Sequence, residues 1–96
     1  MATPPLTPDQ IAAALRELPG WTLDRDALAR AFQFGNFKEA LTFMVRAGFE
    51  AEAMGHHPEW TNVYNRVAVR LTTHDAGNRV TAKDTELAKR ISALAA

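Results

Sequence analysis

A long helical segment in the middle of the chain, Phe37–Met54, most constrains its fold. Its apolar residues recur at helical spacing, a Gly-Asn pair at 35–36 precedes it, and a Gly-His-His-Pro sequence at 55–58 ends it. In a chain of 96 residues, this helix leaves only short segments on either side. A length of this order is typical of one domain, so we expect a single domain over residues 1–96.

Two pairs of predicted strands flank this helix. Trp21–Leu23 and Leu28–Phe34 precede it and are joined by a turn around residues 24–26. Trp60–Asn65 and Val67–Thr73 follow it, and the last segment alternates apolar with smaller or polar residues. Because neither pair contains a long crossover, we expect the strands to form an antiparallel sheet.

Capping patterns predict a helix at each end of the chain. Thr7–Gln10 supplies a capping hydroxyl, a proline at the first helical position and a glutamine two positions later, and the Pro-Gly pair at 19–20 stops this helix. Thr81–Asp84 opens the last helix in a similar way, after a turn at residues 75–78. The order α-β-β-α-β-β-α predicts an α+β fold, with a four-stranded antiparallel sheet and helices packed on one side.

The apolar arc of the central helix indicates a second partner for it. On a helical wheel the arc covers roughly half the circumference, which is more than packing on one sheet requires. We therefore expect a homo-oligomer, with Phe43, Ala47 and Met54 on the flank that contacts the other subunit.

Composition excludes several classes of protein. Lys and Arg together number 11, as do Asp and Glu, so the chain lacks the basic footprint of a nucleic-acid binder. The absence of cysteine excludes disulfides and thiolate chemistry. The first ten residues do not resemble a signal peptide, and no apolar run is long enough to cross a membrane. We expect a soluble, cytoplasmic protein with no nucleic-acid or membrane partner.

The three histidines, His56, His57 and His74, all lie at predicted element boundaries, where functional sites are often built. Pro58 favours an extended backbone at His57, so the two adjacent imidazoles diverge and can serve different parts of one ligand. The alternative for the pair is a solvated helix end, stabilised by the helix dipole when protonated. The alternative for His74 is an exposed residue at a strand end.

Two carboxylates are candidate partners for these histidines. Glu52 falls inside the apolar arc of the central helix, where an unpartnered carboxylate is costly, although it could instead extend into solvent from the last turn. Asp84 is placed to cap the last helix, yet it is also in line with the inward-facing Ala88 and Ile91. By default Trp60 and Tyr64 are core or rim aromatics, and near a histidine cluster they could also enclose a planar ligand. Lys83 is expected to be solvated.

Taken together, these residues resemble the signature of the pterin-4a-carbinolamine dehydratases, and the likeness extends over nearly the whole chain. The matching pattern is Glu52-x3-His56-His57-Pro58-x5-Tyr64-x9-His74-x9-Asp84. The neighbouring segments that also match are His56-His57-Pro58-Glu59-Trp60-x-Asn62-Val63-Tyr64-Asn65, Leu71-x-Thr73-His74 and Thr81-x-x-Asp84-x-x-Leu87-Ala88. One departure is Gly55, where the family often has Asp or Asn, so any contact of that side chain is absent or replaced.

The resemblance implies an enzyme, a hydro-lyase of the 4a-hydroxytetrahydrobiopterin dehydratase type. Such enzymes act in tetrahydropterin recycling: they dehydrate the 4a-hydroxytetrahydropterin left by aromatic amino-acid hydroxylases to quinonoid dihydropterin. A hydroxylase is therefore an implied pathway partner, and a pterin is the implied substrate. One proton must reach the leaving hydroxyl and one must leave the ring nitrogen side, and imidazole suits both steps near neutral pH. No cofactor or metal is implied.

By the same resemblance, His56 and His74 form the acid–base pair, and His57 chiefly holds the substrate. Glu52 orients a histidine, Asp84 lies at the pocket edge, and Trp60 and Tyr64 shape the pocket; the supporting residues also include Pro58 and Thr73. Which histidine is the acid, which pterin is physiological, and whether the chain is a dimer or a tetramer remain open, although the family commonly forms tetramers through helix packing.

Two alternatives come from other functional classes. Three histidines with Glu52 or Asp84 could form a zinc site with an open position, although adjacent histidines are an awkward chelating pair. An interaction module is the other alternative, because some animal members of the family bind a homeodomain transcription factor through a helix. The apolar face of Phe37–Met54 would then be the binding surface.

Overall fold

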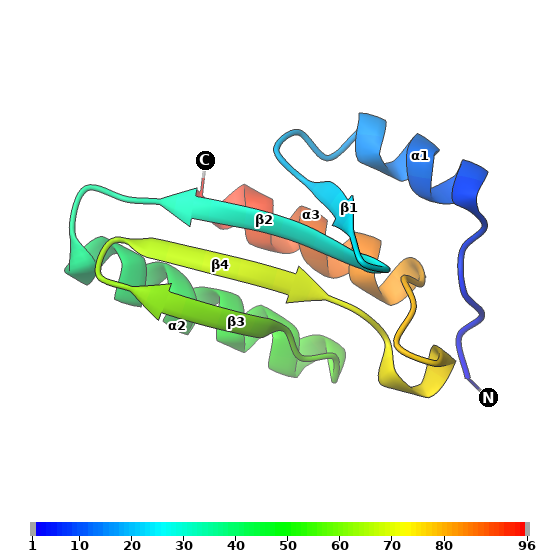
Figure 1. Cartoon of the computed structure of the whole chain (residues 1–96). Helices are drawn as coiled ribbons and strands as arrows, with labels where there is room; N and C mark the ends of the chain where they lie inside the picture. Colours follow the sequence, from blue (N-terminus) through cyan, green and yellow to red (C-terminus); the bar gives the residue numbers. More distant parts are fainter. Residues whose placement is uncertain (1, 96) are drawn as a thin grey trace.

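The helices and strands follow one another in the predicted order in the computed structural model, which describes residues 2–95 (Figure 1). Residues 1 and 96 of the predicted domain lie outside this range. The elements are α1 (Pro8–Arg16), β1 (Thr22–Asp24), β2 (Ala27–Gln33), α2 (Phe37–Met54), β3 (Glu59–Val63), β4 (Arg66–Leu71), the short 3-10 helix η1 (His74–Ala76) and α3 (Ala82–Ala95).

The four strands form one antiparallel sheet in the order β1-β2-β4-β3, which confirms the predicted sheet. The two hairpins meet through β2 and β4, where Leu28 is opposite Leu71. The β1–β2 turn consists of Arg25 and Asp26, both at positive φ, as a two-residue turn of type I′ requires. The hairpins therefore place β2 and β4 side by side in the centre of the sheet, with β1 and β3 at its edges.

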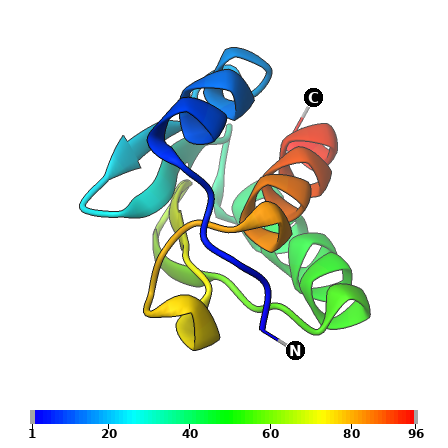
Figure 2. The same cartoon turned by 90° about the vertical axis from the view of Figure 1, so that its right-hand side faces the viewer.

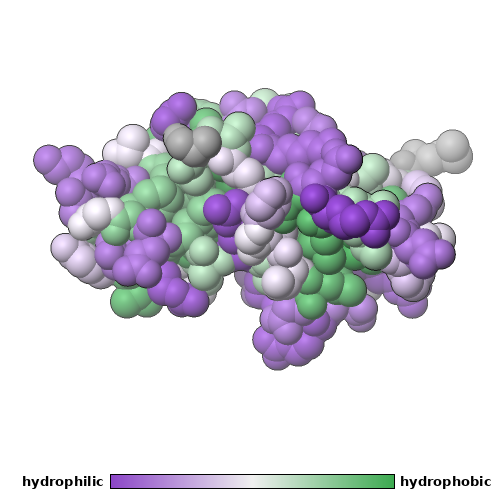
Figure 3. All heavy atoms as spheres, turned by 90° about the horizontal axis from the view of Figure 1, so that it is seen from above, coloured by the Kyte–Doolittle hydropathy of each residue, from purple (hydrophilic) through white to green (hydrophobic). Residues whose placement is uncertain are grey.

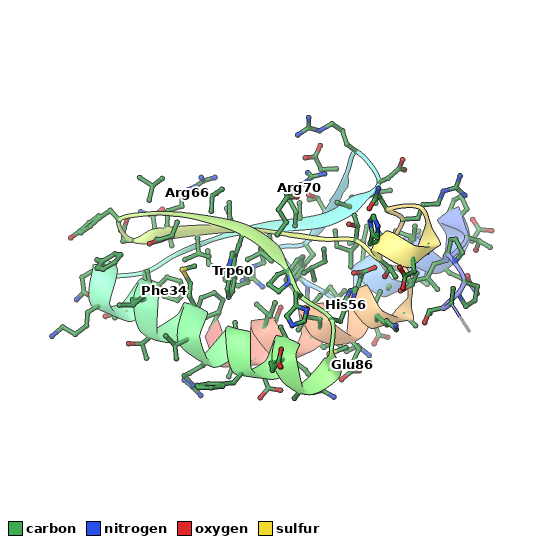
Figure 4. All side chains as sticks on the ribbon, turned by 90° about the horizontal axis from the view of Figure 1, so that it is seen from below. Phe34, His56, Trp60, Arg66, Arg70 and Glu86 are labelled. Carbon is green, nitrogen blue, oxygen red and sulfur yellow. The ribbon has the colours of Figure 1, made fainter. Side chains whose placement is uncertain are left out.

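Helices α2 and α3 cover one face of the sheet, and α1 lies at its β1 end (Figures 1 and 2). Alternate residues of the central strands point into this layer and are buried, whereas Arg66 and Arg70 project from the opposite face (Figure 4). Among the core side chains that are completely buried, the largest are Leu28, Leu71, Leu87 and Ile91. The predicted packing of helices on one side of the sheet is confirmed for α2 and α3.

The surface is mainly hydrophilic when seen from above, with apolar side chains exposed in separate patches (Figure 3). Within residues 2–95, no helix has the length and apolar character needed to cross a membrane. The strands of the second hairpin are shorter than predicted. β3 ends before Tyr64, which has a φ of 50° in the hairpin turn, and β4 ends before Thr73.

Local capping explains why α2 has the predicted bounds. The side chain of Asn36 accepts a hydrogen bond from the Glu39 backbone N–H at the first turn, 2.9 Å away. Gly55 ends the helix with a φ of 63°, in the left-handed region that glycine adopts most easily. The histidine pair therefore begins directly after a helix cap.

The expected subunit-contact flank of α2 is wrong. Phe43 and Ala47 are buried in the core of this same chain, and Met54 packs partly buried against it. The residues of α2 that leave large apolar side chains exposed are Phe37, Leu41, Val45 and Phe49. An arc of half the circumference contains two adjacent apolar stripes, and the wheel does not indicate which stripe contacts the sheet.

Candidate active site

The three histidines gather around one surface hollow of about 310 Å³, at the junction of three segments of the chain. The segments are the end of α2, the stretch after β4 and the first turn of α3. The residues that line the hollow are Gly55, His56, His57, Thr72, Thr73, His74, Asp75 and Lys83. The sheet thus brings His74 beside a histidine pair that precedes it by two strands.

His56 is the buried member of the set. Its ring lies at the end of α2, between the sheet and the helix layer (Figure 4), and its side chain is only 9% exposed. Its Nε2 atom is 2.6 Å from Oδ1 of Asp84, which is fully buried. The resemblance places Asp84 at the pocket edge; instead it lies behind His56 and does not line the hollow. The inward orientation predicted from its place in the helix is confirmed.

The second oxygen of Asp84 is held from two sides. Oδ2 accepts hydrogen bonds from the hydroxyl of Thr73 at 2.8 Å and from the backbone N–H of Thr81 at 2.9 Å. The hydroxyls of Thr73 and Thr81 are themselves 2.7 Å apart. Asp84 therefore caps α3 with one oxygen and holds His56 with the other, so the two interpretations of this residue are both correct.

His57 and Glu52 form a second pair, in solvent. Nε2 of His57 is 2.8 Å from Oε1 of Glu52, and their side chains are 63% and 78% exposed. The expectation that Glu52 lies on a buried face is wrong, because its neighbours on the wheel, Leu41 and Val45, belong to the exposed apolar stripe. Glu52 nevertheless contacts a histidine without lining the hollow itself.

His74 opens η1 rather than ending a strand. Its side chain is exposed, and Nδ1 is 3.3 Å from Oδ1 of Asn78. Gly77 and Asn78 both have positive φ, and the Thr73–Arg79 bridge closes the loop behind them. This tight loop holds the imidazole at the rim of the hollow, opposite the end of α2.

Three residues of the expected site lie elsewhere. Trp60 points from β3 into the space above α2 (Figure 4), where a Cβ atom on Gly48 would lie 4.0 Å from its ring. Tyr64 is 63% exposed in the β3–β4 turn, and neither aromatic lines the hollow, nor does Pro58. Trp60 lies within β3 and Tyr64 lies after its far end, so the strand carries both rings away from the histidines.

The sequence did not single out Thr72 or Asp75, and it predicted Lys83 to be an ordinary solvated residue. Lys83 is exposed, yet it lines the hollow, and its backbone N–H donates to the Thr81 hydroxyl at 3.2 Å. Its position one residue before Asp84, in the capped first turn, is the signal that could have indicated it. Thr81, which the sequence indicated as a helix cap and as part of a matching segment, is fully buried beneath the site.

The zinc alternative requires several ligands side by side. Among residues 2–95, no three His, Cys, Asp or Glu side chains are grouped in a way that could hold a metal ion. Asp84 pairs with His56 and Glu52 pairs with His57, whereas His74 contacts Asn78 and lies apart from both pairs.

Comparison with known proteins gives a consistent result. The family model described as pterin 4 alpha carbinolamine dehydratase matches residues 4–94. Proteins of Opitutus terrae and Rhodopseudomonas palustris, both named "Putative pterin-4-alpha-carbinolamine dehydratase", are 64% and 55% identical, over 88% and 95% of this chain and 88% and 91% of their own lengths. A crystal structure from Brucella melitensis, titled as a transcriptional coactivator/pterin dehydratase, superposes with a TM-score of 0.92 at 42% identity and covers 96% of this chain and 99% of that one.

Proposed function

This chain belongs to the pterin 4 alpha carbinolamine dehydratase family, and on that premise we propose that it dehydrates 4a-hydroxytetrahydropterin by histidine acid–base catalysis. The family indicates a hydro-lyase that acts on a pterin. The observation that carries the mechanistic proposal is the hollow lined by His56, His57 and His74, in which His56 alone is held by a buried carboxylate.

The reaction transfers two protons and no net electrons. The bond between C4a and the hydroxyl oxygen breaks, one proton joins the departing hydroxyl to form water, and one proton leaves N5 as the C4a–N5 double bond forms. An imidazole has an unperturbed pKa of about 6.5, so it can donate or accept a proton near neutral pH. A general acid and a general base together are sufficient for this step.

His56 and His74 are assigned to the two proton transfers. Within residues 2–95 every buried side-chain nitrogen and oxygen has a hydrogen-bond partner, and His56 Nδ1 makes no hydrogen bond to these residues. Nδ1 is therefore the atom through which His56 meets the hollow. His74 lies across the same hollow, and His57, held by Glu52, is assigned to positioning the pterin ring.

The deciding experiment is an assay on chemically generated 4a-hydroxytetrahydropterin. We expect the protein to accelerate the appearance of quinonoid dihydropterin above the spontaneous rate, and to keep that rate after treatment with a chelator. A rate equal to the spontaneous one would refute the proposed activity. Activity restored only by added zinc would favour the metalloenzyme alternative.

We further propose that residues 1–96 form one domain that acts in the cytoplasm, in tetrahydrobiopterin recycling after an aromatic amino-acid hydroxylase. One continuous core cluster, to which α1, α2, α3 and the sheet contribute, supports the single domain. The family supports the pterin chemistry, and the hydroxylase is the class of enzyme that generates a 4a-hydroxypterin.

A homo-oligomer, a dimer or a tetramer, is proposed to form through α2. Its exposed face carries Phe37, Leu41, Val45 and Phe49, with exposed fractions between 45% and 71%. These side chains recur once per turn and form a single apolar row, which is typical of an interaction surface. The interaction-module alternative would use the same row.

The sequence of this row supports an antiparallel arrangement of two copies about Val45. Leu41 and Phe49 are equally far from Val45 along the helix, so each would meet the other across a twofold axis. Lys38 and Glu52 are also equidistant from Val45 and carry opposite charges. An antiparallel pairing brings these opposite charges together, whereas a parallel pairing brings like charges together.

Light scattering tests this assembly. The unmodified protein should be larger than a monomer at micromolar concentration, and Val45→Arg should be monomeric with unchanged circular dichroism. Lys89→Glu, an exposed charge change on α3, serves as the control and should leave the assembly intact. A monomeric unmodified protein would refute the oligomer, and an oligomeric Val45→Arg variant would refute this interface.

A further inference from the structure

The hydrogen bonds around Asp84 can each be given a direction, because the number of hydrogens in the cluster is limited. A threonine hydroxyl has one hydrogen to donate, and an ionised carboxylate only accepts. The Thr73 hydroxyl donates to Asp84 Oδ2, so its oxygen must accept in its contact with Thr81. The Thr81 hydroxyl therefore donates to Thr73, and its own oxygen accepts from the Lys83 backbone N–H.

This chain of donors ends at a carboxylate that receives hydrogen bonds on both oxygens. Oδ2 accepts from Thr73 and from the Thr81 backbone, which leaves it no place for a proton. Only Oδ1 remains, and it lies 2.6 Å from Nε2 of His56, a separation that holds one hydrogen between the two atoms. With Asp84 ionised, that hydrogen belongs to Nε2.

We propose that the hydroxyls of Thr73 and Thr81 are positioning groups that, through Asp84, keep the neutral His56 ring in the Nε2–H form, so that it exchanges protons with the substrate through Nδ1. This inference rests on the proposed function for its catalytic consequence, although the ring form itself can be measured without substrate. The hydrogen bond made by one ring nitrogen commonly determines the state of the other.

Because the network is buried, its hydroxyls can determine which ring nitrogen of His56 carries the hydrogen. Thr81 and Asp84 are fully buried and Thr73 is 4% exposed, so water cannot replace a missing hydroxyl without opening the structure. Thr73→Val keeps the shape of the side chain but removes both the donor to Asp84 and the acceptor for Thr81. The carboxylate then loses one of the two donors on Oδ2 and becomes a stronger base. It can then take the shared hydrogen from Nε2 of His56 while Nδ1 takes up a proton from the solvent, which leaves the ring neutral in the Nδ1–H form.

Nitrogen-15 NMR of histidine-labelled protein tests the proposal, at a pH where the ring is neutral. The chain has only three histidines, and His56→Gln identifies the signal of that ring. We expect the Nε2–H pattern in the unmodified protein and an increased Nδ1–H population in Thr73→Val. Thr73→Ser retains the hydroxyl and should restore the original pattern. Thr85→Val is the matched control, because its hydroxyl bonds only the Ala82 carbonyl of α3.

Kinetics of the same variants provide the second readout. A hydrogen bond to a charged group contributes about one to two powers of ten in an equilibrium constant, so Thr73→Val should lower kcat about 10-fold to 100-fold with little change in KM. Thr73→Ser should recover most of this loss. A purely structural role would instead lower the thermal stability of Thr73→Val without changing its ring pattern. Thr73→Val, Thr73→Ser and the Thr85→Val control would then share the same ring pattern.

The outcomes separate this inference from the proposed function. An Nδ1–H ring in an active unmodified protein would overturn the inference and leave the dehydratase standing. An inactive protein with the Nε2–H ring would refute the function and support the positioning network. A Thr73→Val protein whose ring pattern and kcat match those of Thr85→Val would overturn the role of the hydroxyls.

Discussion

Two adjacent histidines each pair with a carboxylate. The two pairs have similar nitrogen–oxygen distances but differ in burial. His56 and Asp84 are 2.6 Å apart and buried, whereas His57 and Glu52 are 2.8 Å apart and mostly in solvent. Water screens the exposed pair, and salt screens it further. The buried pair has no such competitor. The surroundings of a short contact, more than its distance, therefore determine what that contact can do.

The difference follows from where the two partners originate. Glu52 belongs to the same helix end as His57, so this pair forms from local sequence alone. Asp84 reaches His56 from another helix, 28 residues away, and is itself fixed by Thr73 and Thr81. The His56–Asp84 pair therefore forms only when the whole chain is folded, and its loss should lower the stability of the whole fold.

The largest effect is expected when the buried pair is broken. Asp84→Ala leaves His56 and two donors without their partner and should cost about 3–5 kcal/mol of the free energy of unfolding. Urea unfolding measures this loss. Asp84→Asn keeps the shape and should lose less stability than Asp84→Ala while still lowering kcat. A loss below about 1 kcal/mol in Asp84→Ala would mean that the buried pair behaves like the exposed one.

Replacing the two histidines that are proposed to transfer protons is expected to have the next largest effect. His56→Ala and His74→Ala should each lower kcat by about 10²–10⁴-fold in steady-state kinetics, with folding checked by circular dichroism. The double variant should lose much less than the product of the single losses, because the two residues are proposed to act as a unit. If His74→Ala matches the unmodified protein, the proton-transferring pair must instead be His56 and His57.

His57→Ala should affect binding more than chemistry. Its ring is exposed and is assigned to holding the pterin, so KM should rise with kcat nearly unchanged. The free energy of unfolding should change by less than about 1 kcal/mol, as expected for an exposed pair. A loss of kcat comparable to that of His56→Ala would contradict the distinction between the two neighbours.

The smallest effect is expected at Glu52. Glu52→Gln should raise KM by a few-fold at low salt, because it removes the charge that holds the His57 ring. In the unmodified protein, KM should rise toward the same value as sodium chloride is increased, since salt screens an exposed pair. The kcat contribution of Asp84 should stay constant over this range. If the contributions of both pairs were equally sensitive to salt, the buried pair would be screened like the exposed one.

Local signals predicted the parts of this molecule that depend on neighbours in sequence. Asn36 and Gly55 cap α2 at the predicted residues, and the Thr7 capping box opens α1. The helical wheel indicated a broad apolar arc but not which half contacts the sheet. For this reason the sequence wrongly placed Glu52 on a buried face and wrongly placed the subunit contact around Phe43.

The site depended on contacts that sequence spacing cannot reveal. Asp84 was predicted to face inward, but its partner was not identifiable, because the strand order that brings Thr73 beside α3 emerges only in the folded sheet. For the same reason Trp60 takes the core position expected by default and does not line the hollow. Its neighbours along the chain include the histidine pair, yet the β3 pleat turns the ring toward Gly48 instead.

Gly55 has a consequence for how this site could change over time. It lies at the edge of the hollow with a φ of 63°, and a Cβ atom there would meet nothing within 4 Å. Asn and Asp are the side chains that best tolerate this backbone region, so either could be introduced with little strain and would restrict the unfolded chain. The position is thus open to a new polar group at the edge of the hollow without any repacking. If the hollow binds the substrate as proposed, substrate range can be adjusted at this residue while the buried network stays unchanged.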